Sequence, residues 1–283
     1  MTTTRVRAHL ALVSAAFLFG TTFVTVKAAI RHAEPIPFLG ARFTVGALVL
    51  LPFASRRPAL AGERRGGLLA GAALLAGYVF QTIGLQYTSG SVSAFITYLL
   101  VVFVPVLHAL RTRRMPERGI ALGVLVALVG LFLLTGAKGV GFGRGEVLTV
   151  GCAFAFALHI LALEAAAGRA DALRLNVIQL AVVASACLVP GFFLGGYGFP
   201  AATWLAVLYT GVATSALAFF LQIWGQAHVD ATRASLVLLT EPVFAAVFGA
   251  LVGDRLGWTG LTGAMLIFAG IAVSEVAPPR IAR

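Results

Sequence analysis

The sequence predicts an all-α integral membrane protein, with ten transmembrane helices arranged as two inverted five-helix repeats around a central cavity. Composition gives the first indication: 60% of the 283 residues are hydrophobic and 11% are charged, with a mean hydropathy of +0.98. A soluble domain carries roughly 25% charged residues, so this chain has too little polar surface to cover a water-facing globule. Two further observations support this class: the chain divides into ten apolar segments, and its second half repeats its first.

Each apolar segment is long enough to cross a bilayer, which takes about 20 predominantly apolar residues. Charged or turn-rich breaks place the spans at 8–30, 36–54, 66–87, 91–111, 118–136, 146–167, 172–196, 201–224, 229–252 and 257–276. The first span could pass for a signal peptide. Its apolar run is longer than a signal core of about 7–15 residues and lacks a clear small-residue cleavage site, so we interpret it as an uncleaved span.

The distribution of charge predicts the orientation. With the N-terminus inside, 15 of the 21 Lys and Arg residues fall in inside loops and 4 in outside loops, while Lys27 and Arg42 lie within spans. Positive residues gather on the cytoplasmic side of membrane proteins. We therefore expect a multi-pass protein of the cytoplasmic membrane with both termini in the cytoplasm. The net charge of +11 then reflects the lipid bilayer as a partner and indicates no nucleic acid.

The two halves of the chain are similar to each other. "FQTIGLQ" at 80–86 matches "FLQIWGQ" at 220–226 when shifted by 140 residues, and the same shift relates Gly123 to Gly263 and Gly130 to Gly270. We place the first repeat at 1–137 and the second at 138–283. Because each repeat holds five spans, an odd number, the second copy must enter the membrane from the opposite side. Inverted repeats of this kind are typical of secondary transporters, whose substrate sites lie near the bilayer midplane.

Four stretches resemble the ten-span members of the drug/metabolite transporter superfamily that carry two EamA repeats. They are "FGTTFVTVKAAI" (19–30), "FLGARFTVGALVLL" (38–51), "GLQYTSGSVSAFITYLLVVFVPVL" (84–107) and "ASLVLLTEPVFAAVFGALVGDRLGWTGLTGAMLIFAGI" (234–271). Three positions depart from the family pattern: Phe19 where Trp is common, Asp254 where Glu usually closes the ninth span, and Arg114 at its counterpart in the first half. The resemblance implies an exporter of small metabolites, amino acids or drugs, and leaves the substrate open.

Glu241 and Pro242 interrupt the most apolar segment about halfway along the ninth span. An ionisable side chain within a span costs several kcal/mol and usually faces the bundle interior or a wet cavity. Glu241 could bind a cationic group or carry a coupling proton; alternatively, it is protonated and hydrogen-bonded to a neighbouring helix. Pro242 cannot donate a helix hydrogen bond and predicts a kink, as does Pro105 in the fourth span.

Two cations lie within spans, toward the outer ends. Lys27 and Arg42 could extend to the interface, or point inward to meet an anionic substrate group, such as a carboxylate, or Glu241. His159 in the sixth span could relay protons, although a buried neutral histidine making one hydrogen bond is the more common arrangement. Further pathway candidates are uncharged, and some will serve as interhelical hydrogen bonds: Tyr78, Gln81, Tyr98, Gln179 and Gln222.

Small residues recur at heptad spacing in the last span of each half, at Gly123 and Gly130 and at Gly263 and Gly270. This spacing favours close helix packing. We assign the fifth and tenth spans a structural role, either within the chain or as a homodimer seam.

Three function classes compete. A secondary transporter of a small-molecule substrate, working by alternating access with Glu241 as the candidate for proton coupling, accounts for the inverted repeat and for the absence of a GxxxxGK[ST] nucleotide loop. An enzyme is disfavoured because HExxH and GxSxG are absent and the five histidines are scattered singly, and we expect no cofactor and no metal. A passive channel or a membrane scaffold remains an alternative.

Overall fold

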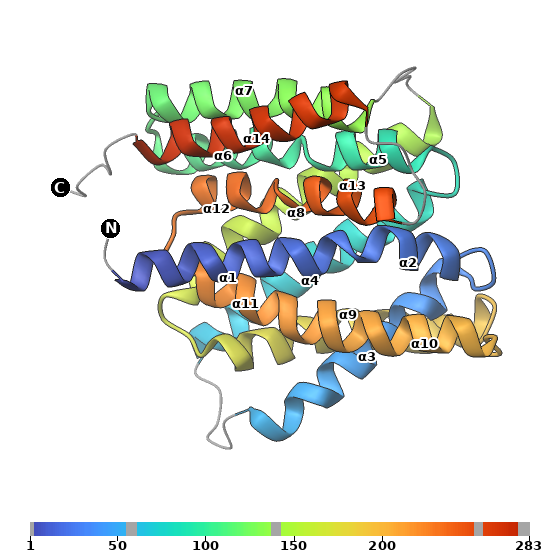
Figure 1. Cartoon of the computed structure of the whole chain (residues 1–283). Helices are drawn as coiled ribbons and strands as arrows, with labels where there is room; N and C mark the ends of the chain where they lie inside the picture. Colours follow the sequence, from blue (N-terminus) through green and yellow to red (C-terminus); the bar gives the residue numbers. More distant parts are fainter. Residues whose placement is uncertain (1–2, 55–60, 137–142, 252–256, 277–283) are drawn as a thin grey trace.

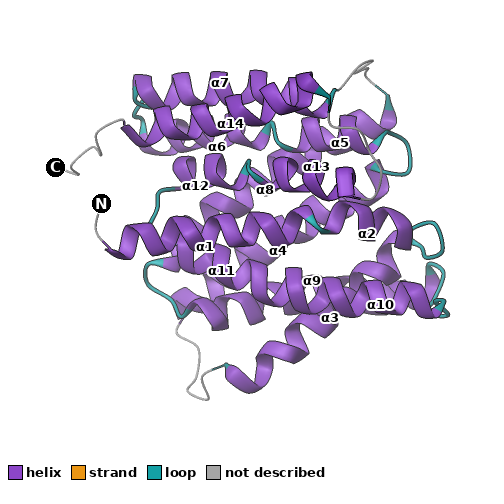
Figure 2. Ribbon diagram, in the orientation of Figure 1, coloured by secondary structure: helices purple, strands orange, loops and turns teal. Residues whose placement is uncertain are grey.

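The computed structural model describes residues 3–54, 61–136, 143–251 and 257–276, and every regular element among them is helical. Figure 2 shows these helices joined by short loops. Ten helical segments are long and apolar enough to cross a membrane: Thr3–Ala29, Pro35–Phe53, Gly62–Gly84, Gly90–Thr112, Arg118–Thr135, Arg144–Ala167, Ala172–Phe193, Ala201–Gln226, Ala231–Leu251 and Trp258–Val276. The predicted all-helical class and its ten spans are thus confirmed. The predicted repeat boundary at 137/138 and Asp254 lie outside the described residues.

Six spans are single helices or nearly so, and four are interrupted. The uninterrupted spans are α3 (Pro35–Leu50, extended by a 3₁₀ turn at Leu51–Phe53), α4 (Ala61–Gly84), α7 (Arg118–Thr135), α8 (Arg144–Ala167), α9 (Ala172–Phe193) and α14 (Trp258–Val276). The interrupted spans are α1 (Thr3–Gly20) with α2 (Thr22–Ala29), α5 (Gly90–Thr97) with α6 (Leu100–Thr112), α10 (Ala201–Tyr209) with a π-helix (Thr210–Ala218) and α11 (Phe219–Gln226), and α12 (Ala231–Leu238) with α13 (Glu241–Leu251).

Local chemistry explains where several helices begin. The side chains of Ser89, Asp171 and Asp230 accept hydrogen bonds from backbone N–H groups three residues later, at 3.2, 2.9 and 3.0 Å, and so cap α5, α9 and α12. Pro35 opens α3 at a position where a missing N–H costs nothing. Gly136, with φ of +55°, ends α7.

The contacts between helices follow the same pattern in the two halves of the chain. α7 packs on α14 and α3 packs on α9, and each pair joins equivalent spans of the two halves. The contact of α4 with α8 recurs as α1 with α11, and that of α4 with α9 recurs as α3 with the π-helix. Exchanging the halves therefore leaves the pattern unchanged, which is consistent with the predicted inverted repeat.

The first and last described helices start and finish at one end of the molecule. In Figure 1, α1 begins and α14 ends on the same side, and α7 with α14 forms an outer layer at the top of the bundle. A cluster of buried apolar residues drawn from most of the spans, including Leu12, Phe43, Leu74 and Leu131, fills the interior.

The glycines of α7 and α14 face each other across this outer layer. A Cβ atom on Gly123 would lie 2.5 Å from the Gly270 carbonyl oxygen, and one on Gly130 would lie 2.6 Å from that of Gly263. The pairing of the earlier glycine of one helix with the later glycine of the other makes the helices antiparallel. The small-residue face is therefore occupied within the chain, and a homodimer through these spans would have to use another face.

Candidate functional site

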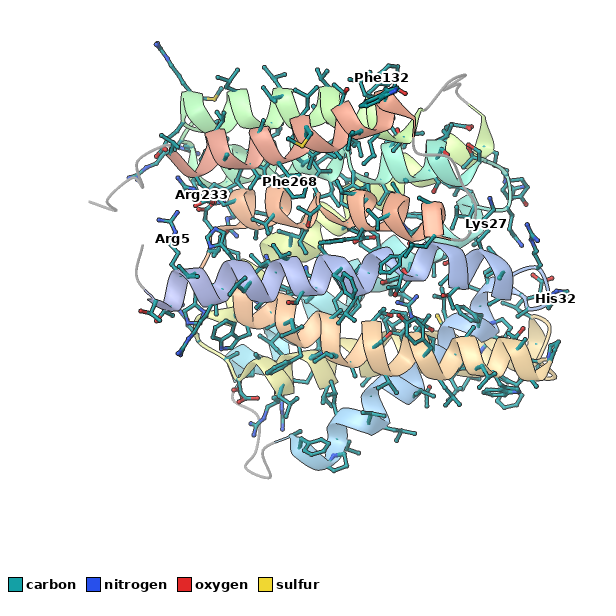
Figure 3. The ribbon with its side chains drawn as sticks, in the orientation of Figure 1. Arg5, Lys27, His32, Phe132, Arg233 and Phe268 are labelled. Atoms are coloured by element: carbon teal, nitrogen blue, oxygen red, sulfur yellow. The ribbon has the colours of Figure 1, made fainter. Side chains whose placement is uncertain are left out.

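A cavity of about 660 Å³ opens among the helices, within the range of roughly 300–1,000 Å³ typical of small-molecule sites. Its mouth carries Lys27, Ser89, Ser91 and Thr135, which lie where their spans meet one end of the bundle. Its inner part reaches the middle of the bundle. Figure 3 shows Lys27 near one end of the helices, with Arg5 and Arg233 near the other.

The interrupted helices border this cavity. Thr22 follows the break in the first span, Thr97 and Leu100 flank the break in the fourth, and Leu238 and Glu241 flank the break in the ninth. Irregular backbone at membrane depth is tolerated only where protein or a water-filled cavity surrounds it. The breaks in the fourth and ninth spans occupy corresponding positions of the two halves, which is the arrangement that marks binding sites in repeat transporters.

Arg42 lies buried beside the cavity, on α3, with 2% of its surface exposed. Its Nε donates to Ser215 Oγ at 3.1 Å, and its Nη2 donates to Thr214 Oγ1 at 2.9 Å and to the Tyr78 hydroxyl at 3.3 Å. The guanidinium also stacks 4.9 Å from the centre of the Tyr78 ring. Arg42 therefore does not extend to the interface. Lys27, by contrast, is exposed at the mouth.

Glu241 is the first residue of α13 and lines the cavity, half-buried. The Tyr98 hydroxyl faces its carboxyl group across the two helix breaks. Arg42 is the cation whose charge acts on Glu241. Among the described residues the two side chains form no ion pair within 4.0 Å, although both line the cavity.

His159 lines the cavity from α8 and is held from behind by α9. Asn176 Nδ2 donates to the carbonyl oxygens of Ser215 and Ala216 at 3.4 and 2.8 Å, so its Oδ1 faces Gln179, whose Nε2 donates to it at 2.9 Å. The Gln179 Oε1 atom then faces His159 Nε2, 2.9 Å away, and accepts a hydrogen bond from the N–H group of that nitrogen. This chain of bonds fixes both amide orientations and the protonated nitrogen of His159.

Most predicted pathway residues lie together on the cavity wall: Lys27, Arg42, Tyr78, Gln81, Tyr98, His159, Gln222 and Glu241. Gln179 is an exception, since it is fully buried behind His159 and does not line the cavity. Gln222 donates to Gln226 at 3.0 Å, and Gln226 ties the eighth span to the Ile160 carbonyl at 3.1 Å.

Pro242 and Pro105 were predicted to kink their helices, but the breaks in both spans lie at other residues. Pro242 lies in the first turn of α13, where it needs no hydrogen-bond partner, and the chain is already broken at Leu239 and Thr240. Pro105 lies inside α6, which runs on through it, and the break in its span comes earlier, at Tyr98 and Leu99.

Three polar residues behind the cavity were not predicted: Asn176, Thr214 and Ser215. Asn176 lies three residues before Gln179 and therefore on the same helical face, which is a signal that the sequence contains. Thr214 and Ser215 lie in the π-helix Thr210–Ala218, a rare element that is frequent at functional sites. Nothing in the sequence marks that element.

The end opposite the mouth is closed by ion pairs. Glu275 pairs with Arg5 at 2.9 Å, with His9 at 3.1 Å and with Arg233 at 3.8 Å, which joins α14, α1 and α12. Glu164 pairs with Arg111 at 2.7 Å and accepts from the Ala231 N–H at 2.9 Å, which joins α8, α6 and α12. Every ion pair among the described residues lies at this end.

Comparisons with known proteins agree with this architecture. The model of the EamA-like transporter family matches residues 6–136 and 143–275. An uncharacterized transporter of Archaeoglobus fulgidus is 30% identical over 272 residues, covering 95% of this chain and 86% of that protein. The Bacillus subtilis transporter YoaV, also uncharacterized, is 24% identical over 94% of this chain and 96% of its own length.

Two further comparisons are narrower in what they show. A probable terminal-alkyne amino-acid exporter of Streptantibioticus cattleyicolor is 38% identical over 55 residues, 19% of this chain and 18% of that protein. A crystal structure with a TM-score of 0.82 covers 98% of this chain and 100% of its own, at 20% sequence identity, and so supports the fold alone.

Proposed function

The chain belongs to the EamA-like transporter family, and we propose that it is a secondary transporter that exports small polar or amphipathic metabolites by alternating access. The family predicted from the sequence is confirmed, as is a multi-pass membrane protein of the transporter class. The substrate, the direction and the mechanism are our proposal. The chain's own membrane would be the cytoplasmic one, with both termini inside, because the basic residues gather in the loops on that side.

One observation carries the proposal: the cavity is open toward one end of the bundle, while ion pairs close the other end. In the predicted orientation the open end faces outward, and the sealed end faces the cytoplasm. An alternating-access transporter passes through such a state, and its two similar halves can exchange roles to give the opposite one.

The ion pairs at the closed end are weak enough to allow this end to open. The Arg5–Glu275 and Arg111–Glu164 pairs are partly exposed, and such pairs are worth about 0–1 kcal/mol each. A few of them can therefore hold one state without making it irreversible. Breaking the Glu275 and Glu164 contacts would remove the polar ties of α14 and α8 to α12, the half-helix that leads to the cavity floor at Leu238.

Export and amino acids are supported by resemblance. The Streptantibioticus cattleyicolor relative is described as a probable amino-acid exporter, and amino acids are the first substrates to test. Glu241 supports proton coupling, because it is a lone carboxyl group near the middle of the span and has access to the cavity. A passive channel is the alternative, but a pore sealed at one end would conduct only after the same gate had opened.

The experiment is untargeted mass spectrometry of the culture medium. Cells that overexpress the wild type are compared with cells that carry Glu241→Gln at matched membrane abundance and with an empty-vector control. We expect particular metabolites to accumulate outside with the wild type and not with Glu241→Gln. If all three media match, export is contradicted.

A further inference from the structure

We infer that the cavity recognises its substrate through a carboxylate group, bound jointly by Nη1 of Arg42 and the hydroxyl of Tyr78. This inference rests on the proposed transport function and adds the chemical class of the substrate and the two residues that select it. It follows from counting which donors the protein itself has used and which remain open to the cavity.

The guanidinium of Arg42 has five N–H groups in a planar fork. Three of them are used, one from Nε to Ser215 and two from Nη2 to Thr214 and Tyr78. The two N–H groups of Nη1 have no acceptor among the described residues, and Nη1 is not among the buried atoms that lack a partner. Since Arg42 borders the cavity, Nη1 faces the cavity space.

The protein neutralises none of the charge that these donors carry. All three acceptors of Arg42 are hydroxyl groups, and no carboxylate among the described residues lies within ion-pair distance. A charge in a protein interior is costly unless it is paired. The surrounding hydroxyls therefore hold the guanidinium in place while its pairing with an anion is left to a ligand.

Tyr78 contributes a second open donor at the same place. Its oxygen accepts from Arg42 Nη2, which leaves its own proton for another acceptor, and the residue lines the cavity. The ring is held in place by Phe43 and Phe156, with ring centres 5.0 and 5.3 Å away. One oxygen of a carboxylate can thus meet Nη1 while the other meets the Tyr78 hydroxyl.

The number of donors favours a carboxylate over a phosphate or sulfate. Charge-assisted bonds to a planar two-oxygen anion match one guanidinium nitrogen and one phenol. The other two hydroxyls that bind Arg42, those of Thr214 and Ser215, are fully buried and do not line the cavity, so they offer the further oxygens of a tetrahedral anion no donor. Glu241 lines the same cavity, and its carboxyl group is suited to an amine on the same substrate.

The test begins with export by cells and compares four proteins at matched membrane abundance: wild type, Arg42→Gln, Tyr78→Phe and the control Arg144→Gln. Arg144 is exposed, stacks on Tyr87 and does not line the cavity. We expect the metabolites that the wild type exports to be carboxylates. We expect Arg42→Gln to lower their export about a hundredfold, Tyr78→Phe about tenfold, and Arg144→Gln not at all.

A matched pair of probes then isolates the carboxylate. Purified wild type in liposomes is given the most strongly exported acid and the primary amide of the same molecule. The KM for transport of the acid should be at least about tenfold lower than the KM for transport of the amide. In Tyr78→Phe, which keeps the packed ring, this preference should shrink while the maximal rate stays similar.

The outcomes separate this inference from the function on which it rests. If the wild-type medium matches the empty vector, the transport proposal fails and the inference fails with it. If the wild type exports metabolites that lack a carboxylate, or if Arg42→Gln or Tyr78→Phe in monodisperse form exports acids at the wild-type rate, the inference is overturned while transport stands.

Discussion

The Nε2 atom of His159 donates a hydrogen bond to Oε1 of Gln179 over 2.9 Å, and this bond joins the cavity wall to the polar chain behind it. Gln179 passes the connection to Asn176, which binds the carbonyl groups of the π-helix that also carries the partners of Arg42. The position of Arg42 is thus tied to α8 and α9 as well as to its own helix.

Replacing Gln179 with leucine should destabilise the protein by about 1–3 kcal/mol, because the substitution leaves buried polar atoms of His159 and Asn176 without a partner. Thermal unfolding in detergent measures the change. The double variant His159→Leu/Gln179→Leu should lose less than the sum of the two single variants. Strict additivity would contradict the proposed hydrogen-bonded chain.

The glycine seam between α7 and α14 predicts a second stability effect. Gly130→Ala places a methyl group against the Gly263 backbone, so we expect about 1–3 kcal/mol of destabilisation. Gly62→Ala is the matched control, because a Cβ atom there meets nothing within 4 Å and alanine favours a helix. Equal melting temperatures for the two variants would show that the seam is not tightly packed.

Glu241 provides the test of coupling. If it carries the coupled proton, Glu241→Gln in liposomes should abolish the dependence of substrate flux on a pH gradient, because the amide cannot release a proton. Flux driven by the substrate's own gradient is measured in parallel as the control. A pH dependence that equals that of the wild type would rule out proton coupling through Glu241.

Lys27 provides a test of orientation. It is exposed at the cavity mouth, and the chain has one other lysine, Lys138, which lies outside the described residues. In a Lys138→Arg background, a membrane-impermeant amine reagent applied to intact cells should label Lys27. Labelling only after the cells are opened would place the mouth on the cytoplasmic side and reverse the proposed orientation.

The sequence predicted the parts of the site that depend on composition and period. Each span follows from the length of an apolar run, and Glu241, Arg42 and Lys27 stand out because ionisable groups are rare in such runs. Gln179 was predicted to line the substrate pathway because a single sequence does not distinguish a polar residue on the cavity wall from one buried directly behind it. The breaks at Tyr98 and Leu239 arise from packing around the cavity, and Pro105, the visible signal in the fourth span, lies beyond its break.

The ion pairs at the closed end also escaped prediction. Glu164 binds Arg111 and the backbone of Ala231. These residues are far apart in the chain, and only the packing of α6, α8 and α12 brings them together.

Reciprocal labelling of the two ends of the bundle distinguishes alternating access from a continuous pore. Cysteines are introduced singly at Ser91, at the mouth, and at Ser235, which is buried in α12 between Arg233 and Leu238, in a background where Cys152 and Cys187 are alanine. Glu275→Gln is then added to weaken the closed end, where Glu275 binds Arg5 and Arg233.

Alternating access predicts that Glu275→Gln raises the labelling rate at Ser235→Cys and lowers it at Ser91→Cys, each by a few-fold for a shift of about 1 kcal/mol. An increase at Ser235→Cys with no decrease at Ser91→Cys would mean that both ends are open together, as in a channel, and would contradict alternating access.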